Sequence, residues 1–382
     1  MRLRFQYSKN RTLKCAFLPL FAYFMLSSVS YIYKLGYPAS KDINTHSSNH
    51  LVNKYDGVAL SATSNQSGSS IAYTLVKPIY LIGQNNLTIS GDSINGKSAA
   101  CIALLNCSNI HITRCKLMNS SSQGIYLYNC TNVLIDSCFF NNVSAGVFVH
   151  IGSNIKVLNN EFLQMRGPFP AGNFVQFNGV TGGGNQINYN KCEDVLGAGT
   201  NPNPGAGDGL SLYQCNGIPT SPIQIIGNWI RGGGTNTGSM GMAGIVAGDG
   251  GNSSWQVIKN NILVNPGYAG IQVISGSNIS VKYNQIYSAK FPWSGVGISS
   301  SNYTNTPASN DTIAYNTIYW LAGYLNMGKR DTVWKPHVTT ILNPRPVGWD
   351  TNITNSPING SILPLSIISY ENLLASSTKK IY

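Results

Sequence analysis

The acidic side chains best suited to catalysis lie between residues 193 and 249. Asp208 stands between two glycines just before a predicted strand, and it is the carboxyl group that we expect to do acid–base chemistry. Glu193 and Asp194 belong to the same predicted insertion, so either could pair with Asp208 as glycoside-hydrolysing carboxyl groups do. Asp249 is predicted six positions further along the strand direction, about 20 Å away, which is too far for such a pair.

Basic and aromatic residues in the same region suggest a second reaction. β-Elimination from a uronate needs a cation that neutralises the carboxylate and a base that removes the C5 proton. Arg166 and Arg231 are the available cations, with Tyr213 or His150 as further groups. Asp208 would then serve as a charge partner or as a ligand of calcium, the one cofactor that the pattern suggests. Asp208, Arg231 and Arg166 are therefore the predicted catalytic residues. A Cys–His metal site is not expected, because no His lies near a Cys pair in the sequence.

These residues are carried by a repeated sequence pattern. One polar column recurs along the chain, and its first four members are 23, 23 and 22 residues apart. A second column, usually Gly, opens an apolar strand in each repeat. The polar column comprises Asp92, Cys115, Cys138, Asn160, Cys192, Asn228, Asn260, Asn284 and Asn316, and the strand-opening column Gly124, Gly146, Asn173, Gly209, Gly244, Gly270 and Gly295. Such a period predicts a solenoid whose coils bury their apolar sides against one another.

The fold class predicted from this pattern is all-β, a right-handed parallel β-helix with three short strands per coil. Asn suits its tight turns, because Asn tolerates the left-handed conformation and its stacked amides can hydrogen-bond along the axis. The phrases Asn109–Ile112, Asn132–Ile135, Asn154–Val157 and Asn278–Val281 resemble the repeats of the pectate-lyase-like superfamily. The resemblance covers roughly residues 85–320 and implies the fold.

The same resemblance leaves the activity open. The superfamily includes polysaccharide lyases, glycosidases, uronan epimerases and non-catalytic surface proteins, and a fold does not select among them. This chain lacks the Asp-Asp pair followed by His and Arg-x-Lys that pectin hydrolases carry. Two hypotheses follow: a secreted protein acting on an acidic glycan, with lyase activity, or a non-catalytic protein that binds glycan or builds a surface.

Insertions predict where a glycan would bind. Three coils carry extra residues at one corner, Glu161–Gly172, Glu193–Asp208 and Arg231–Ala243, so a cleft is expected over residues 173–249. Side-chain alternation predicts its floor as Val175 and Phe177, Ser211 and Tyr213, and Val246 and Gly248, extended by Tyr126, Tyr128, Phe148 and His150. The predicted substrate-binding residues are Tyr213, Phe177, Ser211, Asp249, Glu193 and Asp194.

The ends of the chain have a different composition. Residues 1–30 are predicted to be a signal peptide or an uncleaved anchor, and residues 31–84 a polar lead-in with an N-terminal cap. The β-helix is expected over 85–322 and a C-terminal capping segment over 323–382. The eight cysteines lie partly in stacked columns, which favours buried free thiols over disulfides.

Charge points to the partner. The chain has 382 residues and a formal net charge of +12, from 25 basic and 13 acidic residues. Cleavage after Ser30 would remove five basic residues and leave 20 − 13 = +7. A basic exported solenoid favours an acidic polysaccharide over nucleic acid. We expect a secreted or cell-surface monomer that contacts a membrane only if its N-terminal segment is uncleaved.

Overall fold

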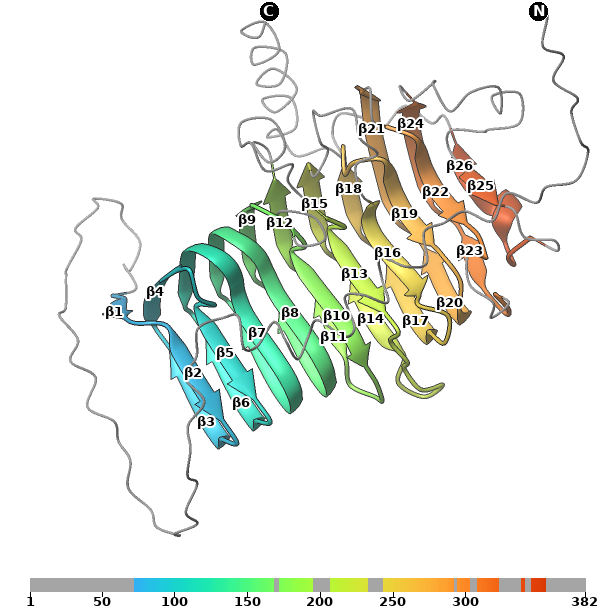
Figure 1. Cartoon of the computed structure of the whole chain (residues 1–382). Helices are drawn as coiled ribbons and strands as arrows, with labels where there is room; N and C mark the ends of the chain where they lie inside the picture. The colour runs from blue at the N-terminus through green and yellow to red at the C-terminus, as the bar shows by residue number, and fades with distance from the viewer. Residues whose placement is uncertain are drawn as a thin grey trace, which may run out of the picture. The chain divides into compact units, whose positions relative to one another are not determined.

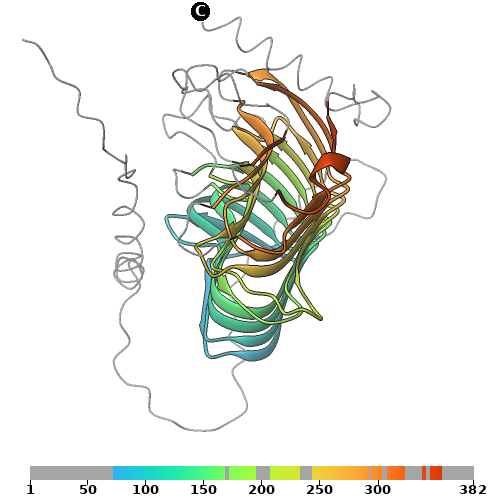
Figure 2. The same ribbon diagram turned by 90° about the vertical axis from the view of Figure 1, so that its right-hand side faces the viewer.

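The computed structural model describes residues 72–167, 172–194, 207–232, 243–291, 294–302, 308–322, 338–340 and 345–354. All of them belong to one compact unit, Tyr55–Tyr382. They form a parallel β-helix, as the repeat pattern predicts, whose coils follow one another along the axis in Figure 1 and superpose in the view of Figure 2. Each coil contributes one strand to each of three parallel stacks.

The first stack carries the predicted cleft. Its strands are β2 (Ile79–Ile82), β5 (Ile102–Leu105), the middle parts of β7 (Lys116–Asp136) and β8 (Phe139–Leu158), β10 (Val175–Val180), β13 (Leu210–Tyr213), β16 (Ala243–Asp249), β19 (Ala269–Val273), β22 (Val296–Ser300) and β25 (Val338–Thr340).

The second stack follows the first along each coil. Its strands are β3 (Asn85–Ser90), β6 (Ser108–Thr113), the last parts of β7 and β8, β11 (Gln186–Asn188), β14 (Ile223–Ile226), β17 (Ser254–Lys259), β20 (Ser277–Lys282) and β23 (Thr312–Ala314).

The third stack closes the coil. Its strands are β1 (Thr74–Val76), β4 (Asp92–Lys97), the first parts of β7 and β8, β9 (Glu161–Met165), β12 (Lys191–Asp194), β15 (Trp229–Gly232), β18 (Ile262–Val264), β21 (Gln285–Phe291), β24 (Thr317–Ala322) and β26 (Ile353–Thr354). A short 3₁₀ turn, η1 (Trp349–Thr351), precedes β26.

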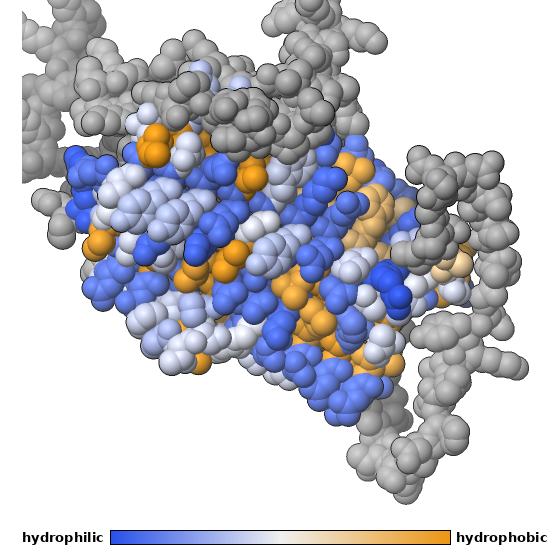
Figure 3. Space-filling model, turned by 180° about the vertical axis from the view of Figure 1, so that it is seen from behind, coloured by the Kyte–Doolittle hydropathy of each residue, from blue (hydrophilic) through white to orange (hydrophobic). Residues whose placement is uncertain are grey.

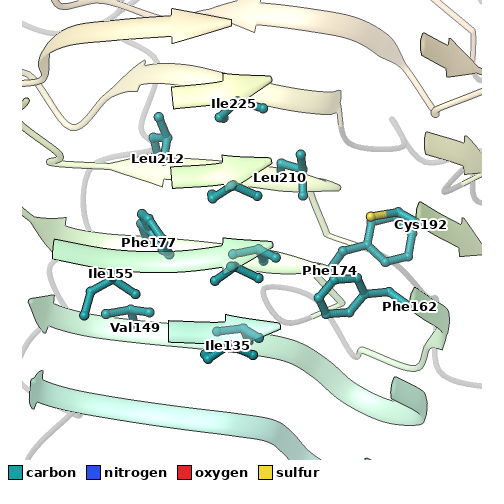
Figure 4. Close-up of a cluster of buried hydrophobic side chains, with 14 of the residues drawn as sticks. Ile135, Val149, Ile155, Phe162, Phe174, Phe177, Cys192, Leu210, Leu212 and Ile225 are labelled. Carbon is teal, nitrogen blue, oxygen red and sulfur yellow. The ribbon is translucent and has the colours of Figure 1, made fainter. Parts of the chain in front are cut away.

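The core fills the space that the three stacks enclose. Inward side chains lie in register from coil to coil, such as Val147, Val175 and Leu210 of the first stack, and all three are fully buried. Phe140 and Phe162 stack with their ring centroids 4.4 Å apart inside the third stack. Figure 4 shows such side chains pointing into the interior from successive coils. On the outside, seen from behind in Figure 3, apolar side chains are interspersed with hydrophilic ones.

A ladder of asparagines holds the turn between the second and third stacks. After the first member, Asn160, whose oxygen accepts from the Cys138 N–H at 2.9 Å, each side-chain oxygen accepts hydrogen bonds from the backbone N–H and the side-chain amide of the preceding Asn at 2.8–3.0 Å. The members are Asn160, Asn190, Asn228, Asn261, Asn284, Asn316 and Asn352. Two predicted members are wrong: Cys192 points into the core and Asn260 occupies the left-handed turn position, because each lies one or two residues from the true Asn.

The solenoid is longer than predicted. β1 and β2 pair with β4 and β5 as ordinary coil strands, so the coils begin at Thr74 rather than at Asn85. At the other end β25 and β26 continue the first and third stacks past residue 322. The predicted signal segment 1–30, most of the lead-in and most of the C-terminal segment lie outside the described residues.

Two further features concern cysteines and membranes. The seven cysteines of the described ranges are free and buried, and Cys15 lies outside those ranges. Burial raises the pKa of several of these thiols, that of Cys101 and that of Cys215 to about 12.

Within the part of the chain that the structure describes, no helix is long and apolar enough to span a membrane.

Candidate functional site

A row of polar side chains crosses the outward side of the first stack. His150 of β8, Asn178 of β10, Tyr213 of β13 and Asp249 of β16 are direct partners in the strand register. All four are partly exposed. Because adjacent strands are about 4.8 Å apart, the row presents one hydrogen-bonding group per coil over four coils. This spacing suits successive contacts with a chain molecule that crosses the strands.

Phe177 does not belong to the floor, contrary to the prediction. Val175 pairs with Leu210 and both point inward, so Phe177 is in the core with 0% of its surface exposed. The strand opens at Phe174, which occupies the place of Gly209, rather than at Asn173. A shift of one residue moves every side chain to the other side of a strand. The outward residues of β10 are therefore Gln176 and Asn178, which the sequence analysis missed.

The other predicted floor positions differ in access. Ser211 and Val246 occupy outward positions, and both are buried. Val246 packs with Ala243, Ala269 and Val296 in a small apolar cluster of their own. Tyr126 stacks on Phe148 at 6.0 Å, and Tyr128 meets the edge of the His150 ring at 5.4 Å. The accessible floor is therefore aromatic over β7 and β8 and polar from β10 to β16.

A β-bulge sets the position of Asp249. The register of β13 against β16 shifts between Ser211 and Tyr213, and Gly248 adopts a left-handed φ of 69°. The buried Gln256 accepts from the Gly248 N–H at 3.0 Å and donates to the Cys215 carbonyl at 2.9 Å. A Cβ atom at Gly248 would lie 1.8 Å from the Ser275 carbonyl oxygen, so the bulge requires glycine. As a result Asp249 faces Tyr213, five strand positions from Asp208 instead of the predicted six.

Burial shifts the proton affinity of the groups in this region. Burial raises the pKa of Asp249 to about 6, against an opposing hydrogen bond from the Gly250 backbone. It also raises the pKa of Tyr213, to which the negative charge of Asp249 contributes. The pKa of His150 is lowered by burial, which favours a neutral imidazole near pH 7. The row therefore combines a carboxyl group that titrates near neutrality with three neutral hydrogen-bonding groups.

Asp208 lies two residues before β13 and is held by hydrogen bonds from Ala243 and Asn173. Its Oδ1 accepts from the Ala243 N–H at 3.2 Å, and its carbonyl oxygen accepts from Asn173 Nδ2 at 2.7 Å. Burial raises the pKa of Asp208 to about 7, the Ala243 N–H opposes this, and the charge of Asp249 adds to it. Five strand positions correspond to about 16 Å between α-carbons, longer than the spacing of paired glycosidase carboxyl groups. The two carboxyl groups nevertheless share one electrostatic environment.

The remaining predicted residues lie on the third stack. Glu193 and Arg231 are strand residues that face each other in register, and their side chains form an ion pair. The Arg231 guanidinium also lies 5.4 Å from the Trp229 ring centroid. Asp194 is buried opposite Gly232, and Arg166 directly follows β9. The structure therefore brings Glu193 to Arg231, and places both on a different stack from the Tyr213–Asp249 row.

Calcium stays a prediction. Within the described ranges, no three His, Cys, Asp or Glu side chains cluster closely enough to hold a metal ion.

Comparison with known proteins identifies the fold family. The family described as "Right handed beta helix region" matches residues 39–193 and 79–239, which together span just over half of the chain. The chain belongs to this family of right-handed β-helix proteins. Comparison with curated protein sequences finds no match.

Solved structures with similar folds include enzymes and an adhesin. An alginate lyase from Paenibacillus sp. str. FPU-7 is 13% identical, with 63% of this chain and 86% of that chain covered at a TM-score of 0.39. DFA-IIIase from Arthrobacter chlorophenolicus A6 is 12% identical, with 67% and 65% covered at 0.40. PfbA, a surface adhesin of Streptococcus pneumoniae, is 14% identical, with 61% and 69% covered at 0.33. At these identities and TM-scores the likeness concerns the fold alone.

Proposed function

We propose that this protein is a secreted or cell-surface polysaccharide-acting β-helix whose site is the outward side of β10, β13 and β16. The observation that carries the proposal is the row His150–Asn178–Tyr213–Asp249, in register over four coils. Its three neutral members can bind sugar hydroxyls, and the Tyr126–Phe148 stack continues the floor with apolar ring surface. The basic segment and apolar run of residues 2–33 support export.

The chemistry that the row supports best is acid-assisted cleavage of a glycosidic bond. A carboxyl group whose pKa is raised to about 6 is protonated in a useful fraction near neutral pH, so Asp249 can donate a proton to the leaving oxygen. Asp208 lies about 16 Å away between α-carbons, too far to act as the partner base, so the attacking water loses its proton to solvent. The sugar–oxygen bond breaks as the Asp249 proton reaches that oxygen, water adds its hydroxyl to the sugar carbon, and solvent returns a proton to Asp249.

Elimination from an acidic glycan has less support at this site. A uronate carboxylate must be neutralised by a cation, and a free carboxylate beside Asp249 would be repelled. Among the described outward positions of the first stack there is no Lys or Arg, and Arg231 already pairs with Glu193 on the third stack. The geometry therefore favours a neutral glycan in this cleft.

The deciding experiment uses the purified full-length protein and a panel of neutral and acidic polysaccharides. New reducing ends and unsaturated uronide absorbance are followed together, with and without calcium. We expect reducing ends without uronide absorbance, and loss of at least ~100-fold in rate for Asp249→Asn. Asp350→Asn, at an exposed position of η1, is the matched control and should retain full activity.

Other results would redirect the proposal. Uronide absorbance that depends on Arg231 or Arg166 would establish a lyase instead. Binding of a glycan without any product, unchanged in Asp249→Asn, would establish the non-catalytic role. Asp208→Asn belongs in the same series, because Asn keeps the acceptor for the Ala243 N–H while removing the titratable proton. The mature N-terminus, read by mass spectrometry, tests export with cleavage near Ser30.

A further inference from the structure

Exposed tyrosines line the turn between the second and third stacks. Tyr189, Tyr283 and Tyr315 each directly precede a ladder asparagine, and we call them together the tyrosine edge. They are 60%, 48% and 51% exposed. Because this turn joins the second and third stacks, it lies across the solenoid from the first stack and its polar row.

The backbone at these positions is unfavourable for tyrosine. The three residues have φ values of 57°, 58° and 57°, the left-handed region that costs free energy for a side chain with a Cβ atom. The same turn position is filled elsewhere by Asn159, Gly227 and Asn260, which bear that conformation more easily, and by Arg114 and Ser137, which share the cost. Burial does not offset the cost, since about half or more of each tyrosine is exposed. Such a local outlier is a reason to look for a function.

The rings are ordered along the solenoid axis. Tyr283 and Tyr315 stack with centroids 5.3 Å apart and planes 10° apart. The Tyr189 ring lies over the next coil, where a Cβ atom at Gly227 would be 2.6 Å from it. The coil repeat of about 4.8 Å separates Tyr283 from Tyr315, whereas Tyr189 lies three coils before Tyr283, with Gly227 and Asn260 at the turn positions between them. That repeat is close to the length of one sugar residue in an extended polysaccharide.

Positive charge accompanies the tyrosines. Lys259 Nζ lies 5.4 Å from the Tyr283 ring centroid, and Lys282 occupies the equivalent outward place on the next strand, β20. In the described stretches 254–264, 277–287 and 309–319 the one acidic residue is Asp311, which is buried. The edge thus combines aromatic contact area with two lysines, and on the last described coil the exposed Asp350 pairs with Arg345. The first stack, by contrast, offers a carboxyl group and no cation among its described outward positions.

We propose that the tyrosine edge binds an anionic polysaccharide that runs along the solenoid axis. Lys259 and Lys282 would meet its carboxylate or sulfate groups, and the tyrosine hydroxyls and ring borders its sugar rings. This second site is separate from the cleft of the first stack and does not depend on catalysis there. The acidic glycan suggested by the net charge of +12 would then bind at this edge without being cleaved there.

The test is affinity gel electrophoresis of the full-length protein in gels containing polygalacturonate, alginate or dextran sulfate, with neutral dextran as control. We expect retardation by at least one anionic polymer, none by dextran, and a steep loss of binding with added salt. Tyr283→Asn with Tyr315→Asn should weaken the apparent Kd at least tenfold. Asn accepts the left-handed turn, as residue 260 shows, so the fold is preserved. Lys259→Gln with Lys282→Gln should have a similar effect.

Matched controls separate this site from the cleft and from general charge. Tyr80→Asn with Lys156→Gln changes one tyrosine and one lysine away from the edge and should bind as the parent protein does. Asp249→Asn should also bind normally, so failure of the proposed catalysis leaves this proposal standing. Three results would overturn it: no retardation by any of the anionic polymers, unchanged binding in the tyrosine variants, or equal affinity for single-stranded DNA.

Discussion

Tyr213 and Asp249 lie directly opposite each other on β13 and β16, although counting residues from the strand openings places Asp249 one position further along. The bulge at Gly248 absorbs the extra residue. Bulges are frequent next to functional sites because they redirect one side chain without changing the rest of the sheet. Here the redirected side chain is the carboxyl group that completes the polar row.

Gly248→Ala should therefore destabilise the protein and remove the site. The new methyl group would meet the Ser275 carbonyl at 1.8 Å in addition to the strain of a left-handed φ. We expect a loss of roughly 3 kcal/mol or more in the free energy of unfolding. Gly83→Ala is the control, because its φ is 64° and nothing lies within 4 Å of the added atom. That variant should lose only about 1 kcal/mol. Equal losses in urea unfolding would contradict this account of the bulge.

The rate of glycan cleavage should fall as pH rises through about 6. Asp249 donates a proton in the proposed reaction, and its pKa is raised by burial to about 6, so the competent protonated form is depleted above that pH. Measurement of kcat/KM between pH 4.5 and 8.5 gives the profile of the free enzyme. A rate that increases from pH 6 to 8 would exclude Asp249 as the acid.

Asp311→Asn should stabilise the protein at alkaline pH. Asp311 is 5% exposed, and burial raises the pKa of its carboxyl group to about 7, so ionisation above the unfolded-state pKa near 4 progressively favours unfolding. Stability is thus full below pH 4 and declines as pH rises towards 7. Asn retains the acceptor for the Ile279 N–H, as Asn185 does for Ile155 at the equivalent position four coils earlier.

Thermal unfolding between pH 4 and pH 8.5 checks this expectation. The Tm of Asp311→Asn should match that of the parent at pH 4 and exceed it at pH 8. The reverse change, Asn185→Asp, places a carboxyl group at the equivalent buried position and should lower the Tm chiefly above pH 7. A constant difference at every pH would show that ionisation of Asp311 plays no part.

Asn228→Ala should lower the free energy of unfolding far more than a substitution in an exposed row of asparagines does. Asn228 donates to Ile187 and Asn261 and accepts two hydrogen bonds from Asn190, all in the buried interior. Leaving these groups unpaired should cost about 3 kcal/mol or more in unfolding free energy. Asn132→Gly, in the exposed row Asn109–Asn132–Asn154, keeps the left-handed turn and should cost about 1 kcal/mol or less. Comparable denaturation midpoints for the two variants would contradict the buried ladder's role.

The buried thiols should not react with a thiol reagent in the native state. The seven cysteines of the described ranges are buried, and burial raises the pKa of Cys192 and Cys215. A thiol reagent should therefore leave these seven unmodified in native protein and react with them in guanidinium chloride. Fast labelling of any of them by peptide mapping would mean that the coils open locally.

The repeat pattern was sufficient to predict the solenoid, because strand alternation and turn asparagines are local properties that recur from coil to coil. It was insufficient where two neighbouring residues fit one column. Asn173 was predicted to open its strand, but Phe174, one residue later, occupies that position. The error placed Phe177 on the outward side, where Asn178 lies. Asn260 and Asn261 presented the same ambiguity in the polar column.

The location of the candidate site stays a prediction, and the structure places several of its predicted residues elsewhere. The strands of residues 173–249 were found from their insertions, and Tyr213 and Asp249 were named. Glu193 and Arg231 were assigned to loops around the cleft, but they pair on the third stack. The spacing of residues near an insertion does not indicate to which of the three stacks each residue belongs.

The sequence alone determined the β-helix and its three-strand coil, because hydrophobic period and turn chemistry act between adjacent residues. Tertiary structure decided which side chains face outward, which carboxyl group meets Tyr213 and which arginine is already paired. Those outcomes depend on the register between coils, and one bulge at Gly248, held by Gln256 from another strand, is enough to change that register.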